Sequence, residues 1–256
     1  MRKVFLYYPA IAVVTFLLVQ AFWGVFGAIF KIGNITWRAI LSGVVTVVIL
    51  RIIRLFSWRQ TFRTSSIDWS TGMVGVAAAV FGIISLNIVE DMMPLPDQMQ
   101  DTFIAMAFSI EGALCIAVIA PLVEEIVFRE CMLGHMLRNG VNRWVAIVVS
   151  SLVFGIIHLN LAQIPFATAI GIILGIVYYK SGNIVLTSII HILNNSAALV
   201  QMRVLGDDVA DFRLTEWLGG ITTSVLCAVV AMVVCITLLR MFWKTYKKQN
   251  KYETVY

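Results

Sequence analysis

Runs of about 20 apolar residues recur along the whole of this chain. A helix of that length can cross a hydrocarbon core about 30 Å thick. The composition agrees, because 60% of the 256 residues are hydrophobic and 13% are charged. A soluble domain carries about 25% charged residues, so these charges are too few for a water-soluble surface. The chain is therefore expected to be an integral membrane protein.

The apolar runs predict eight transmembrane helices separated by polar loops. They lie at residues 4–30, 37–56, 70–90, 110–138, 143–160, 165–180, 184–202 and 215–242. A short interfacial helix is expected at 102–109, just before the fourth span. No internal repeat or linker divides the chain. The predicted fold class is all-α: one polytopic membrane domain over residues 1–256, a bundle of about eight transmembrane helices around an intramembrane polar cavity.

The charged residues between the spans alternate in sign, which predicts the orientation. One set of loops and both chain ends are basic, through Arg2, Lys3, Arg51, Arg54, Arg59, Arg63, Arg138, Arg143, Lys180, Lys244, Lys247, Lys248 and Lys251. The opposite loops are acidic, through Glu90, Asp91, Asp97, Asp101, Asp207, Asp208, Asp211 and Glu216. Basic loops stay cytoplasmic, so both termini are expected in the cytoplasm. Membrane orientation explains the net charge of +5, and no nucleic-acid partner is expected.

Three predicted spans contain polar side chains that are expensive to place in a membrane. These are Glu124, Glu125, Arg129, His158, His191 and Asn195. An ionisable group at the bilayer centre costs at least about 2.5–3.5 kcal/mol, so each needs a structural or functional reason.

Helical spacing predicts which of these side chains share a face. Glu125 and Arg129 are four residues apart, close enough to pair, and His191 and Asn195 have the same spacing. Glu124 points about 100° away from Glu125 around the helix.

The hairpin between the fourth and fifth spans predicts the depth of two groups. Glu124 comes 17 residues before Val141 and His158 comes 17 after it, so antiparallel helices bring the two to similar depth. Pro121 is expected to kink the fourth span and free a carbonyl near the glutamates.

Each group also has a purely structural interpretation. Glu125 and Arg129 can be a neutralised packing pair, and His158 or His191 can be an interhelical hydrogen-bonding residue. His191 and Asn195 can likewise join two helices as polar contacts. The convergence of two carboxylates, an arginine, two histidines and an amide on three helices favours a functional site.

This set of groups permits amide hydrolysis. A carboxylate in a low-dielectric pocket is a good general base near neutral pH, and Arg129 would hold Glu125 ionised beside Glu124. A histidine can orient and deprotonate a water, and a His–Asn pair offers donors to a developing oxyanion. No serine or cysteine has a base at a recognisable spacing, and no span has an aspartate at mid-membrane.

The succession Glu-Glu-xxx-Arg, Phe-xxx-His and His-xxx-Asn resembles that of the CAAX prenyl endopeptidases and their prokaryotic CPBP or Abi relatives, some linked to bacteriocin processing and immunity. The resemblance covers residues 110–200. It implies that Glu124 is the general base, helped by His158. It also implies that His191 and Asn195 stabilise the oxyanion, with Glu125 and Arg129 in support. The implied substrate is a membrane-associated peptide or a CAAX-like C-terminal tail.

The resemblance implies a glutamate-dependent reaction with no cofactor. The chain has no HExxH pattern, although two histidines and a glutamate could hold zinc, which stays open as a second interpretation. A non-proteolytic immunity or regulatory protein that binds a peptide or partner through the same cavity is the main alternative function. A transporter is disfavoured because no repeat symmetry is visible. The chain's size and lack of appended domains indicate a prokaryotic plasma membrane.

Overall fold

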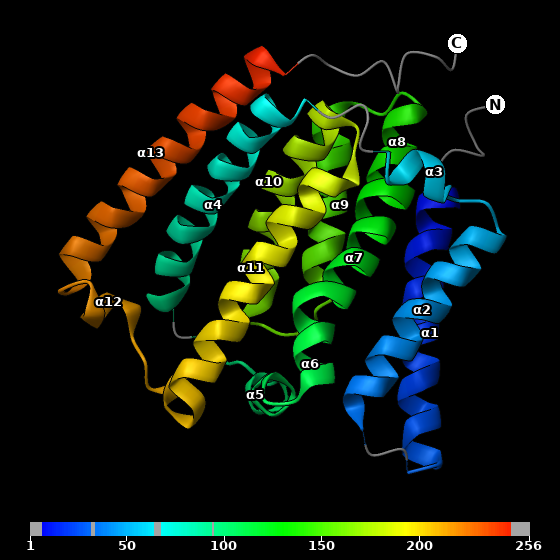
Figure 1. Ribbon diagram of the computed structural model, residues 1–256, viewed down its shortest axis with the longest axis horizontal. Coiled ribbons are helices and arrows are strands. Elements are labelled where there is room, and N and C mark those ends of the chain that lie inside the picture. Colours follow the sequence, from blue (N-terminus) through cyan, green and yellow to red (C-terminus); the bar gives the residue numbers. More distant parts are fainter. Residues whose placement is uncertain (1–6, 32–33, 64–67, 94, 247–256) are drawn as a thin grey trace.

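The computed structural model describes residues 7–31, 34–63, 68–93 and 95–246, and this part of the chain is helical without a strand. Successive long helices run up and down through one bundle (Figure 1). The long elements are α1 (Tyr7–Ile29), α2 (Ile35–Ile52), α4 (Trp69–Asp91), α9 (Arg143–Ile156), α10 (Gln163–Ser181), α11 (Ile184–Leu205) and α13 (Ile221–Thr245). A further segment, Ile110–Arg138, consists of α6 (Ile110–Leu114), η2 (Cys115–Ile119), α7 (Ala120–Glu124), η3 (Glu125–Gly134) and α8 (His135–Arg138).

The predicted all-α polytopic bundle is confirmed, whereas the count of eight spans is not. Each of the eight predicted segments contains a helix, and among the described residues six single helices are long and apolar enough to cross a membrane. The helix expected just before the fourth span is present as α5 (Gln100–Ala107), which makes a 113° bend with the segment Ile110–Arg138. If this bent pair is one span, the number rises to seven. The fifth predicted span, 143–160, is shorter than expected, because α9 has 14 residues.

Short polar residues fix where the helices begin. Asn34, Asp68, Asn142 and Asn183 each accept a backbone N–H of the first turn of the following helix. Such side chains satisfy donors that would otherwise lack a partner at the helix start. At the end of α10, Gly182 adopts a left-handed conformation, with φ of 63°, and allows the tight turn into α11.

Small residues bring helices close together in the half of the bundle that holds the site. A Cβ on Gly171 of α10 would lie 3.1 Å from Ser151 Cβ, and one on Gly175 would lie 3.0 Å from Ile147 Cγ2. The spacing of four residues places both glycines on the face that meets α9. On the other side of the segment Ile110–Arg138, α1 packs on η3 and α2 packs on α7.

Figure 1 separates the basic and acidic loops onto opposite ends of the bundle. The start of α1, the turns α2–α4, α8–α9 and α10–α11, and the end of α13 share one end, which carries the basic side chains. The acidic loops around α5 and α12 (Leu214–Trp217) lie at the other. Five basic residues used in the orientation argument lie outside the described residues: Arg2, Lys3, Lys247, Lys248 and Lys251.

The orientation in the membrane can be tested with cysteine labelling. In intact cells, a membrane-impermeant maleimide is expected to label Glu216→Cys, whereas Arg59→Cys should react only after permeabilisation. The unaltered protein measures the background from its native cysteines. Labelling of Arg59→Cys in intact cells would contradict a cytoplasmic location for the basic loops.

Candidate functional site

The central helix of the site departs from α-helical register at two places. Residues Cys115–Ile119 and Glu125–Gly134 are π-helical, and every residue of the second stretch is buried. A π-helical turn bonds i to i+5 and is frequent at functional sites. This segment is therefore enclosed on all sides by the bundle, which explains why it carries the costly charges.

Pro121 explains how one carbonyl of this helix becomes available. The Ala120 N–H donates to Cys115 O, five residues back. In the same register the partner of Ile116 O would be Pro121, which has no N–H. Asn195 Nδ2 of α11 donates to Ile116 O instead, at 3.1 Å. The expected freed carbonyl thus lies where the sequence predicted it, and it fixes the position of one predicted site residue.

Four polar groups form a continuous chain through the buried site. Arg129 Nε lies 3.5 Å from Glu125 Oε2, and both side chains are completely buried. Glu125 Oε1 lies 3.0 Å from His191 Nδ1. His191 Nε2 then lies 3.6 Å from Glu124 Oε2, and 17% of the Glu124 side chain is exposed. The expected contact between Glu125 and Arg129 is confirmed, and His191 links that pair to Glu124.

The aromatic ring of Phe154 on α9 contacts three basic side chains of the site. The Arg129 guanidinium lies over this ring, 4.6 Å from its centroid. His158 and His191 both meet the ring edge to face, at 5.0 and 5.7 Å between centroids. The face of an aromatic ring attracts a cation, so Phe154 contributes to holding Arg129 in a site where few polar partners exist.

His158 is held by its own helix. Its Nδ1 lies 2.8 Å from Phe154 O at the end of α9. A carbonyl only accepts, so this contact requires a proton on Nδ1. In neutral His158 the other nitrogen, Nε2, is then the basic one. The ring is half-buried.

A small cavity of about 60 Å³ lies against Glu124. Its walls include Phe16 and Gln20 from α1, Ala39 and Gly43 from α2, and Cys115 from the central segment. Of the four predicted catalytic residues, Glu124 alone lines this cavity in the described part of the chain. Hydropathy alone does not show that α1 and α2 supply walls of the site. Gln20, a polar residue within an apolar run, was the one available signal.

A second charged cluster lies further along the same helix. Glu130 accepts from Arg138 Nη1 and from the Tyr178 hydroxyl, each at 2.9 Å. A buried carboxylate needs such partners to balance its charge. Glu130 therefore belongs to the packing of the basic end rather than to the cavity beside Glu124.

Metal ligation by two histidines and a glutamate is the second interpretation of these residues. Within the described ranges, no three His, Cys, Asp or Glu side chains come together as a potential metal site. Metal independence stays a prediction. We expect peptide hydrolysis to survive incubation with a strong chelator followed by gel filtration. Loss of activity that stoichiometric zinc restores would establish the zinc interpretation instead.

Comparisons with known proteins agree with the three motifs. Residues 107–197 match a family model described as type II CAAX prenyl endopeptidase Rce1-like. Over 91 residues the chain is 33% identical to the "Membrane-embedded CAAX protease MroQ" of Staphylococcus aureus (strain USA300), covering 33% of this chain and 36% of that protein. Over 84 residues it is 27% identical to the "Putative membrane peptidase YdiL" of Bacillus subtilis (strain 168), covering 33% and 34%.

The match spans about a third of the length of these curated relatives. No solved structure matches the chain. The matched segment contains the central helix, Phe154, His158, His191 and Asn195. The resemblance carried by the motifs is therefore confirmed over residues 107–197 of this integral membrane protein, which match the model of the Rce1-like type II CAAX prenyl endopeptidases.

Proposed function

We propose that this protein is an intramembrane endopeptidase that uses Glu124 to hydrolyse a peptide bond in a membrane-associated substrate. The observation that carries the proposal is the position of Glu124. The Glu124 carboxylate is partly exposed and lies beside a cavity. His191 links it to the buried pair of Glu125 and Arg129. A packing pair alone needs neither the second carboxylate nor the cavity.

In the proposed reaction, Glu124 removes a proton from a water as the water oxygen attacks the peptide carbonyl carbon. The carbonyl oxygen becomes an oxyanion. Collapse of this intermediate breaks the C–N bond, and protonated Glu124 returns the proton to the leaving amine. General-base catalysis of this kind contributes about 10²–10⁴-fold to a rate. His158 would assist from the side of the water, because the contact of Nδ1 with Phe154 O directs Nε2 away as an acceptor.

The structure favours a different role for His191 from the one that the resemblance implies. Both of its ring nitrogens face glutamates, so neither is directed to an oxyanion. We assign His191 to positioning Glu124 through the link to Glu125 and Arg129. Asn195 would then be the oxyanion donor. Its amide has two hydrogens, and the contact with Ile116 O uses one of them.

The proposed substrate is a peptide within or attached to the bilayer, cut in a prokaryotic plasma membrane by a protein with both termini in the cytoplasm. This substrate class rests on the membrane fold and on the relatives' names, which describe membrane peptidases.

Membranes of the host can supply the test. Purified protein would be incubated with solubilised membranes from cells that lack it, and new peptide ends would be counted by mass spectrometry. We expect ends that appear with the unaltered protein and are absent with Glu124→Gln at equal concentration. The same set of ends from both proteins would show that Glu124 does not cut them.

A further inference from the structure

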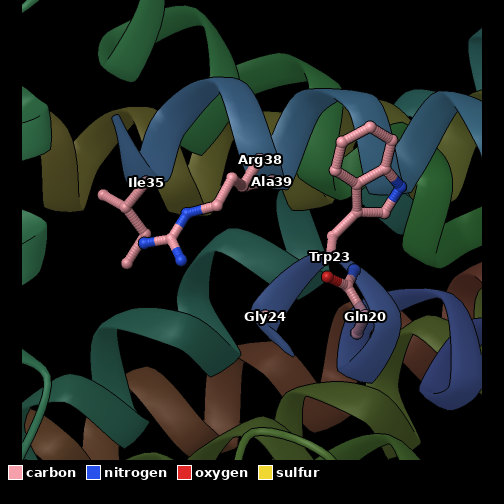
Figure 2. A pocket seen from close by; sticks show the side chains of 6 residues that line it. All are labelled: Gln20, Trp23, Gly24, Ile35, Arg38 and Ala39. Atoms are coloured by element: carbon pink, nitrogen blue, oxygen red, sulfur yellow. The ribbon is translucent and has the colours of Figure 1, made fainter. Parts of the chain in front are cut away.

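A second cavity lies between α1 and α2, and it shares lining residues with the cavity beside Glu124. It has a volume of about 180 Å³ and is lined by Gln20, Trp23, Gly24, Ile35, Arg38 and Ala39 (Figure 2). Gln20 and Ala39 line both cavities. The gap between the two N-terminal helices therefore leads from the acidic end of the bundle toward the proposed base.

Two polar side chains that line this second cavity, Trp23 and Arg38, are hydrogen-bond donors. The buried Nε1 of Trp23 and the buried Nε of Arg38 have no hydrogen-bond partner among the described residues. Ser42 Oγ lies 2.8 Å from Gln20 Oε1. The same hydroxyl also lies 2.8 Å from Ala39 O, so Gln20 contributes a neutral amide to the cavity wall. The Arg38 guanidinium suits a ligand that only accepts hydrogen bonds, whereas the indole nitrogen of Trp23 points away from it (Figure 2).

The charge of Arg38 has no counterpart nearby in the chain. The sequence has no Asp or Glu before Asp68, so the α1–α2 hairpin cannot neutralise Arg38. The structure shows no ion pair for Arg38 with any other described residue. Its position is nevertheless defined, because the side chain lies across Gly27 of α1, where a Cβ would collide with Arg38 Cδ and Nη1.

The spacing of Arg38 and Gly43 along α2 sets the scale for a peptide between the two cavities. Arg38 and Gly43 are five residues apart on α2, which is about 7.5 Å along the helix axis. A Cβ on Gly43 would lie 3.1 Å from Val123 Cγ2, beside Glu124. An extended peptide covers about 7.5 Å in two or three residues.

From this arrangement we infer that Arg38 binds a carboxylate of the peptide substrate a few residues from the bond that is cut, in the cavity that Trp23 and Gln20 also line. The inference rests on the proposed function and makes Arg38 a specificity-determining residue. An acidic side chain and a free C-terminal carboxylate have the same chemistry, and both would fit. A lipid phosphate is the competing ligand, since Arg38 lies only four residues from Asn34 at the helix end.

The test uses a short lipid-anchored alanine–leucine peptide with one glutamate, and the same peptide with glutamine in its place. Each is made with a free and with an amidated C-terminus. For the peptides with a carboxylate, Arg38→Gln is expected to raise KM about tenfold or more and to leave kcat within about threefold. Peptides with neither carboxylate should have the same KM with both proteins. Arg51→Gln, at the other end of α2, is the matched control and should change neither value.

Two further measurements distinguish failure of this inference from failure of the proposed function. Binding of the same peptides to Glu124→Gln protein in nanodiscs is measured without turnover, and Arg38→Gln in that background should weaken binding of the carboxylate peptides by about tenfold or more. This result stands even if no peptide is cut. Arg38→Lys should recover part of the affinity, which checks that the loss is one of charge and not of folding.

The inference would be overturned if Arg38→Gln weakened binding of carboxylate and amide peptides equally. It would also be overturned if Arg38→Gln left peptide binding unchanged and removed a co-purifying anionic phospholipid, because Arg38 would then be a lipid ligand.

Discussion

Replacing Arg129 by alanine is expected to remove most of the folded protein from the membrane. Arg129 is completely buried, and its charge is balanced by Glu125 at 3.5 Å and by the face of Phe154. Without the guanidinium, the Glu125 carboxylate stays buried beside His191 with no balancing cation. Removing one partner of a buried pair costs about 3–5 kcal/mol, a large part of the stability of a typical protein. Thermal unfolding of purified protein in detergent and protein abundance in membranes measure the loss.

Two variants show whether a stranded charge causes that loss. Arg240→Ala removes an exposed arginine from α13 and should change stability by less than about 0.5 kcal/mol. Combining Arg129→Met with Glu125→Gln removes both charges and should recover much of the stability, because neither charge is left without a partner. A stable Arg129→Ala protein would mean that Glu125 does not depend on this arginine for its charge balance.

Helix positions were predictable from the sequence because hydrophobic length and polar caps are local properties. Each predicted span has a helix in the structure, and Asn142 and Asn183 begin α9 and α11. The end of α9 was less accurate. The predicted span continued to residue 160, but the helix ends at Ile156 and Leu159 adopts a positive φ of 51°. Ile157, Leu159 and Leu161 keep the mean hydropathy high through this turn, so hydropathy alone could not show it.

Contacts between residues of the same helix were predictable from the sequence, whereas contacts between different helices were less so. The pair Glu125–Arg129 forms at its expected spacing even though this stretch is π-helical. Matching depths placed His158 with Glu124, yet the closest histidine contact of Glu124 is with His191. Depth along a helix can be counted from a turn, whereas rotation of one helix against another depends on packing across the bundle. For the same reason, the sequence did not predict that α1 and α2 supply walls of the cavity beside Glu124.

Glu124→Gln is expected to lower the rate of peptide cleavage by about 10²-fold or more while the protein stays folded. Glutamine keeps the size of the side chain and its hydrogen-bonding capacity but cannot take a proton from water. The 17% exposure of the Glu124 side chain makes its charge less costly than that of Glu125, so its loss should hardly change the unfolding temperature. Glu111→Gln, a change of the same kind earlier in the same helical segment, is the control and should retain full activity.

The variant Asn195→Ala tests the oxyanion role of Asn195 independently of the general-base role of Glu124. The loss of one oxyanion donor is expected to lower kcat by about 10²–10³-fold with little change in KM. This variant also releases Ile116 O, so its unfolding temperature must be recorded beside its activity. A reduced kcat with unaltered folding would support the assignment, whereas an unchanged kcat would show that Asn195 only caps the carbonyl.

The most direct test of the account is a single-turnover measurement in proteoliposomes, with enzyme in excess over a membrane peptide found to be cut. The account predicts rapid formation of two peptide products by the unaltered protein. Glu124→Gln protein, inserted at equal abundance and equally stable, should form them about 10²-fold more slowly or less. Cleavage at an undiminished rate by Glu124→Gln would contradict the role of Glu124. An unchanged biological activity of Glu124→Gln, with no peptide cut by either protein, would instead identify a non-proteolytic membrane protein that binds its partner through the same cavity.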